Sequence, residues 1–131
     1  MSNADKLAAA WIALTLTPED DQTDEMFDNG FELNNHLFDN PEFAWEVILK
    51  IIQQSNFYKK NHINNEKNEI ILSNLGEGPL ETLLSHHGND FIERIERLAE
   101  GSKSLRFALN NTWKSDITDQ IWSRVLEARS R

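Results

Sequence analysis

Hydrophobic residues recur at spacings of three and four along most of the chain, without a sustained alternation of apolar and polar positions. Such spacing places the apolar side chains on one side of an α-helix. The pattern therefore predicts an all-α fold, a single domain of about eight short helices over residues 1–131. We expect an irregular bundle or stacked helical hairpins, with helices near 4–16, 24–37, 41–54, 66–75, 79–87, 89–100, 103–113 and 118–129.

Capping residues place several of these helix ends. Thr23 or Asp24 can cap the second helix, and Asn40 followed by Pro41 is typical of an N-cap and a first helical position. Gly88 is expected to end a helix in the left-handed conformation. Two segments are predicted to be connectors: residues 17–24, which are acidic, and residues 55–68, which are rich in Asn and Lys. His62, in the second connector, is expected to be exposed to solvent.

Large aromatic residues are expected to fill the core. The four tryptophans all lie on the apolar stripes of predicted helices, where burial is more common than a role as a ligand platform. They are Trp11, Trp45, Trp113 and Trp122.

The stretch "LGEGPLETLLSHHG", residues 75–88, is the strongest candidate in the sequence for a phosphate-binding, metal-binding or catalytic site. A phosphate loop is disfavoured because Pro79 has no N–H to donate, and no Lys-Ser/Thr pair follows the glycines. We interpret the stretch as a corner in which Gly76 ends one helix and Gly78 caps the next. His86 and His87 point about 100° apart on a helix, which makes them a poor metal clamp. His87 is expected to pack at the helix end and donate to a terminal carbonyl, and His86 to face water.

Net charge is −9 and is unevenly distributed. Residues 1–46 hold 11 acidic side chains and one basic side chain, whereas residues 47–131 hold 11 acidic and 12 basic ones. This balance argues against nucleic acid and anionic membranes as partners and favours a basic protein. The candidate partner-binding residues are Glu19, Asp20, Asp21, Asp24, Asp28 and Glu32.

Other chemistry finds little support. The chain has no cysteine, and no serine lies in a G-x-S-x-G elbow. In a calcium-loop alignment of "DDQTDEMFDNG", Phe27 would occupy a ligand position and His36 the position of the bidentate Glu. Glu32 and His36 alone are too few ligands for a metal. We expect no catalytic residues, metal or cofactor, although paired carboxylates for acid–base catalysis stay open.

No apolar stretch approaches the roughly 20 residues needed to cross a bilayer, and the start lacks the basic patch and cleavage site of a signal peptide. A cytoplasmic location is therefore expected.

Several motifs of this chain are similar to those of a known family. They are "DNPEFAW", "LGEGPLETLLSHHG", "FIERIERLA", "ALNNTW" and "DQIWSRV". Together they resemble a family of small bacterial domains of unknown function, which pairs a Pro-Glu-x-Ala-Trp helix start with a Gly-Pro-Leu-Glu turn and a C-terminal Trp. The resemblance covers residues 40–129, with Trp11 as an N-terminal match, and leaves residues 1–39 as acidic N-terminal helices. It implies an all-helical fold and brings no catalytic residues.

Two classes of function remain. The first is a protein-binding domain that holds a basic partner through residues 19–46, in its most concrete form a bacterial immunity protein that neutralises a nuclease-like toxin. The second is an enzyme or small-ligand protein that uses His86 or His87 beside the Gly76–Gly78 turn. A structural adaptor that binds through an apolar face is the remaining alternative.

Overall fold

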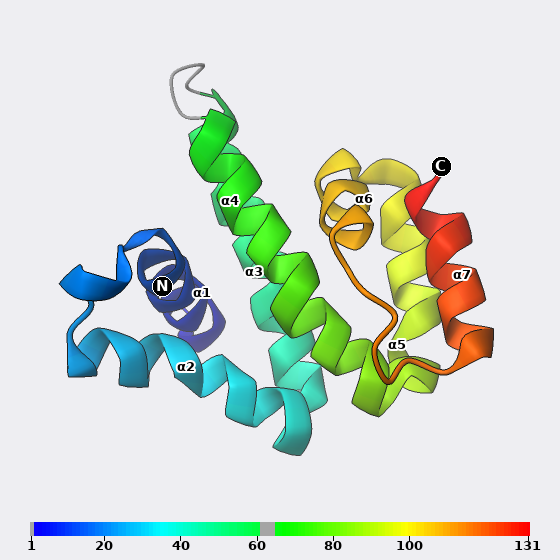
Figure 1. The fold of residues 1–131 in the computed structure, drawn as a ribbon, viewed down its shortest axis with the longest axis horizontal. Coiled ribbons are helices and arrows are strands. Elements are labelled where there is room, and N and C mark those ends of the chain that lie inside the picture. The colour runs from blue at the N-terminus through cyan, green and yellow to red at the C-terminus, as the bar shows by residue number, and fades with distance from the viewer. Residues whose placement is uncertain (1, 61–64) are drawn as a thin grey trace. The chain divides into compact units, whose positions relative to one another are not determined.

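The computed structural model describes residues 2–60 and 65–131, and every regular element within these ranges is helical (Figure 1). The all-α prediction is confirmed. The chain divides into two compact units, residues 1–71 and 72–131. None of the described helices is long and apolar enough to cross a membrane.

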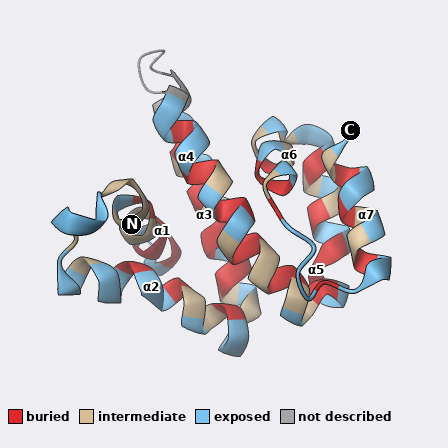
Figure 2. Ribbon diagram, in the orientation of Figure 1, coloured by how far each residue is buried: buried red, intermediate tan, exposed pale blue. Residues whose placement is uncertain are grey.

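The first unit is built on three helices that pack against one another: α1 (Asn3–Leu16), α2 (Asp24–Asp39) and α3 (Pro41–Lys60). A short 3-10 helix, η1 (Glu19–Asp21), lies between α1 and α2. Thr23 caps α2 by accepting a hydrogen bond from the Met26 backbone N–H at 3.1 Å, and α3 begins at Pro41 as expected. Buried positions occur on all three helices (Figure 2), and the apolar core residues include Leu7, Ile12, Leu33, Leu37, Trp45, Ile48 and Ile51.

The second unit contains the end of α4 (Asn65–Leu75), a π-helical turn η3 (Gly76–Leu80), α5 (Glu81–Gly101), α6 (Lys103–Asn110) and α7 (Asp119–Arg129). Within it α5 packs against η3, α6 and α7. Fully buried side chains line these contacts and include Leu80, Leu83, Phe91, Ile95, Leu105, Leu109 and Val125.

The helix count is slightly lower than expected, with seven α-helices among the described residues. The two helices expected at 79–87 and 89–100 form the single helix α5, which is kinked where His87 leaves helical dihedrals (φ −135°, ψ 28°). The prediction that Gly88 takes a left-handed conformation is wrong, because its φ is negative. A Cβ on Gly88 would lie 3.3 Å from Ile121 of α7, so the glycine permits close helix packing instead.

The Gly76–Gly78 segment connects two helices, but it does so without a break in helical backbone. Leu75 and Glu81, which flank the π turn, both have right-handed helical dihedrals. Gly78 is therefore not an N-cap. The Gly76 carbonyl accepts a hydrogen bond from Thr112 Oγ1 at 2.9 Å, which fastens the turn to the end of α6.

The connector expected at residues 55–68 is mostly helical, since α3 continues to Lys60 and α4 begins at Asn65. Ser55 and Asn68 are buried, and the Asn68 side-chain amide donates to the Ser55 carbonyl at 2.9 Å. The connector was predicted from the high asparagine content of this segment. That prediction is wrong because the Asn68 amide makes its hydrogen bond inside the fold and not in a turn. His62 lies outside the described residues.

The tryptophans differ in burial. Trp45 is 8% exposed and belongs to the core, whereas Trp11 and Trp122 are half-buried. Trp113 is 70% exposed, so its assignment to the core is wrong. It follows the end of α6, outside the helix in which it would have shared a face with Leu109.

Candidate partner-binding surface and pocket

All six candidate partner-binding residues are exposed. Three of them, Glu19, Asp20 and Asp21, form η1, and the other three, Asp24, Asp28 and Glu32, lie at four-residue intervals along α2. The six residues therefore lie on two consecutive elements of the first unit, η1 and α2. We call η1 and the solvent side of α2 the acidic face.

The packing of α2 on α1 turns this face outward. Gly30 is buried against α1, where a Cβ would lie 2.8 Å from Leu14 Cδ2 and 3.0 Å from the Ala10 carbonyl oxygen. Leu33 and Leu37 are buried on the same side of α2. Because this side faces α1 and the core, the positions of Asp24 and Asp28 lie toward solvent.

The short helix η1 is fastened to the end of α1 by a side chain. Gln22 Nε2 donates to the Leu14 carbonyl at 3.2 Å and to the Thr17 carbonyl at 3.0 Å. These bonds hold the chain just after Glu19, Asp20 and Asp21. The acidic residues therefore project from an anchored segment.

Sequence reasoning missed three exposed aromatic residues on α2, namely Phe38, which is 46% exposed, and the pair Phe27 and Phe31. Phe27 is 48% exposed and Phe31 is 46% exposed. Their rings stack on each other, with centroids 5.0 Å apart and planes 13° apart. The sequence carried a signal for this exposure, because the positions of Phe27 and Phe31 fall outside the side of α2 that holds Gly30, Leu33 and Leu37.

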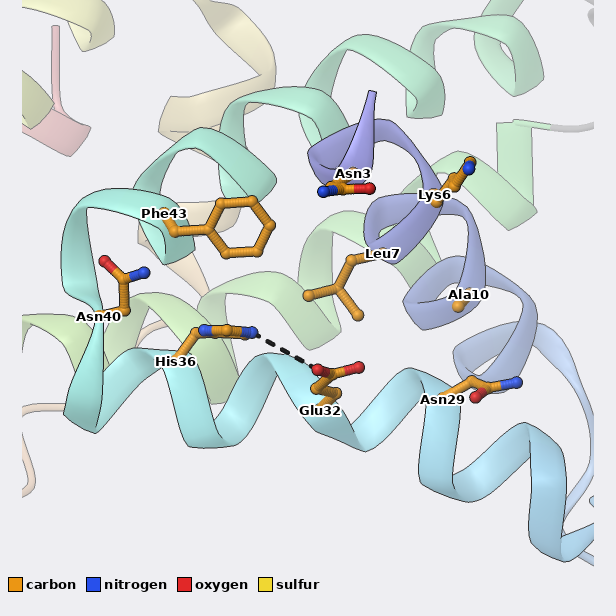
Figure 3. Close-up of a pocket in the computed structure, with 9 residues that line it drawn as sticks. All are labelled: Asn3, Lys6, Leu7, Ala10, Asn29, Glu32, His36, Asn40 and Phe43. Carbon is orange, nitrogen blue, oxygen red and sulfur yellow. Dashed lines mark ion pairs between the residues drawn. The ribbon is translucent and has the colours of Figure 1, made fainter. Parts of the chain in front are cut away.

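A pocket of about 610 Å³ opens between α1, α2 and the start of α3, and Glu32 of the acidic face is one of its lining residues (Figure 3). Glu32 pairs with His36 at 3.7 Å, and the His36 ring meets the Phe43 ring edge to face at 4.8 Å. The remaining lining residues are Asn3, Lys6, Leu7, Ala10, Asn29 and Asn40.

The chemistry of this pocket is mixed. One cation, one carboxylate and three amides surround an apolar floor, so the pocket offers both hydrogen-bond donors and acceptors. Glu32 and His36 are two side chains of metal-ligating type, and no group of three or more His, Asp or Glu in metal-binding range occurs among the described residues.

The two histidines of α5 lie apart from these features along the chain. His86 is exposed, as expected. His87 is half-buried, and its buried Nε2 has no hydrogen-bond partner among the described residues, in place of the expected bond to a helix-end carbonyl. His87 lies at a kink inside α5 and not at the end of a helix, so the helix-end carbonyl groups that were expected to accept a hydrogen bond from it are absent there.

The fold and surface define a small all-helical protein with an acidic, partly aromatic face. The chain belongs to a family of unknown function, DUF6869, whose model matches residues 16–131. Membership in an uncharacterised domain family is thus confirmed, and the match extends through the acidic face but leaves out Trp11. No curated protein and no solved structure matches the sequence.

Proposed function

We propose that this chain is a non-enzymatic protein-binding domain that holds a basic partner through the acidic face. The observation that carries the proposal is the exposure of all six acidic residues on one anchored segment, η1 and α2. Like charges four residues apart on a helix cost a few tenths of a kcal/mol per pair. A basic partner would offset that cost.

The charge distribution supports the same partner. Lys6 is the single basic residue among residues 1–46, against 11 acidic ones. A surface of one sign speeds the encounter with an oppositely charged protein and makes association sensitive to salt.

In its most concrete form the protein is a bacterial, cytoplasmic immunity protein. Nuclease-like toxins bind phosphates with basic residues, and carboxylates placed over such a site would imitate phosphates. The acidic face would then occlude the toxin's active site.

The test is capture of partners by the tagged protein from lysate of its own organism, with washes at low and high salt. A triple charge reversal, Asp24→Lys, Asp28→Lys and Glu32→Lys, is compared with a control that reverses exposed glutamates elsewhere, Glu66→Lys, Glu69→Lys and Glu77→Lys. Both variants change net charge equally. Only the position of the change differs.

We expect a basic protein to bind the wild-type chain and the control at low salt and to be lost from the triple reversal of α2. The captured protein should be inhibited by the wild-type chain if it is a toxin. Equal loss from both variants would mean that net charge alone matters. Retention by the α2 reversal would exclude the α2 carboxylates as the binding surface.

A further inference from the structure

The stacked pair Phe27 and Phe31 leaves an aromatic surface open to water beside the acidic side of α2. Each of the two residues keeps close to half of its surface exposed. Burying aromatic surface is a main source of interface energy, and exposed aromatic patches on soluble chains commonly mark contact sites.

The spacing along α2 pairs each ring with an acidic residue. Asp24 precedes Phe27 by three residues and Asp28 precedes Phe31 by three. Residues three apart are neighbours on a helix surface. The α2 surface thus repeats the same pair, an aromatic ring and a carboxylate, one turn apart.

Arginine matches this repeated pair better than lysine does. A planar guanidinium can lie on a ring face and still direct N–H donors to a carboxylate at its edge. An ammonium group is a compact, strongly hydrated charge and cannot stack in this way.

Two arginine–aromatic contacts occur inside the second unit. The Arg94 guanidinium carbon lies 4.7 Å from the centre of the Phe91 ring, and that of Arg129 lies 5.3 Å from the centre of the Trp122 ring. All arginines of the sequence fall within residues 94–131. The first unit therefore has no arginine of its own to place on Phe27 and Phe31.

A second copy of the chain is a poorer occupant. Symmetric pairing through the two rings would bring Asp24 and Asp28 of one copy against the same carboxylates of the other. Like charges placed together across an interface oppose association.

We propose that Phe27 and Phe31, with Asp24 and Asp28, form a platform that binds arginine side chains of a basic partner in preference to lysine. The inference rests on the proposed function, because it names the partner chemistry that the acidic face selects. It adds that the aromatic pair provides the selectivity and the carboxylates provide the charge attraction.

The test measures binding of two fluorescent peptides, nona-arginine and nona-lysine, by anisotropy at about 0.15 M salt, where long-range attraction is largely screened. We expect the wild-type chain to bind nona-arginine about 3- to 10-fold more tightly, as cation–π contacts at exposed sites would give. The double variant Phe27→Leu/Phe31→Leu should bring this ratio close to one and leave nona-lysine binding unchanged.

A matched control removes one exposed aromatic ring elsewhere, Phe107→Leu, which is 36% exposed on α6. This variant should keep the arginine preference. Thermal unfolding of each variant establishes that the change acts on binding and not on folding.

The outcomes separate the two proposals. Equal binding of both peptides, or a preference that survives the double leucine variant, would overturn the platform and leave the acidic face standing. Failure of the wild-type chain to bind either peptide would remove the acidic face as well. Self-association of the wild-type chain that the leucine variant abolishes would show that a second copy occupies the rings.

Discussion

Gly76 in the π turn lies against the backbone of Ala108 on α6, so closely that a Cβ at position 76 would sit 1.9 Å from the Ala108 carbonyl oxygen. The Cβ is bonded directly to the backbone at position 76, and the Ala108 oxygen is itself a backbone atom, so neither can move as a flexible side chain would. A substitution here must therefore displace the turn or α6, which distinguishes Gly76 from glycines that face open space.

We expect Gly76→Ala to destabilise the protein by about 3 kcal/mol or more, because overpacking at a rigid contact forces backbone shifts. Gly101→Ala is the control, since nothing lies within 4 Å of a Cβ at that position near the end of α5. It should be neutral or stabilising by up to about 1 kcal/mol, as expected for glycine replaced by alanine in a helix. Urea unfolding of both variants checks this, and equal stabilities would contradict the close contact.

A second prediction concerns Glu96 on α5 and Arg124 on α7. Arg124 Nε donates to Glu96 Oε2 at 2.9 Å, and its Nη2 donates to the other carboxylate oxygen. These hydrogen bonds are the largest cause that holds the pKa of Glu96 below its ordinary value of 4.5. The folded state thus binds the proton more weakly than the unfolded state, so the pair stabilises the fold above pH 4.5.

As pH falls through the lowered pKa, that contribution is lost. Glu96→Gln should therefore lower the melting temperature at neutral pH, and the difference from wild type should close in acid below 4.5. Glu93→Gln is the control, because its pair with Arg97 at 2.6 Å is within one helix and mostly exposed. Thermal unfolding over a pH series checks the prediction. A difference that persists unchanged in acid would show that Glu96 stabilises the fold by packing instead.

A third prediction uses the exposure of Trp113. Although its backbone N–H donates to Glu81 Oε1 at 3.1 Å, its side chain is 70% exposed. Trp113→Phe should change the free energy of unfolding by no more than about 0.5 kcal/mol, whereas Trp45→Phe in the core should cost about 1–3 kcal/mol.

Fluorescence provides an independent check. Trp113→Phe should remove the emission most readily quenched by acrylamide, and Trp45→Phe should leave that fraction in place. If quenching were the same after Trp113→Phe, another part of the chain would have to cover this side chain in solution.

The features that sequence predicted well are local. Helical class follows from apolar spacing, and the starts of α2 and α3 follow from Thr23 and from Asn40 with Pro41, because a cap acts on backbone groups within three or four residues of itself. Whether the acidic residues of α2 face solvent was not decided by the sequence, because that depends on which side of α2 packs on α1.

The burial of individual aromatic residues and glycines depends on which helices pack against one another. The spacing of apolar residues within one helix does not specify those contacts. The sequence pattern placed Trp45 and Trp113 alike on apolar stripes, yet Trp45 is 8% exposed and Trp113, which lies beyond the end of α6, is 70% exposed. Glycine is typical of a helix end, so the sequence predicted that Gly88 ends a helix. In the structure Gly88 instead allows Ile121 of α7 to approach α5 closely. Sequence by itself determined the helical class, the starts of α2 and α3, and the excess of acidic over basic side chains. The tertiary structure decided which aromatic residues stay in water, because burial is set by contacts between segments far apart in the chain.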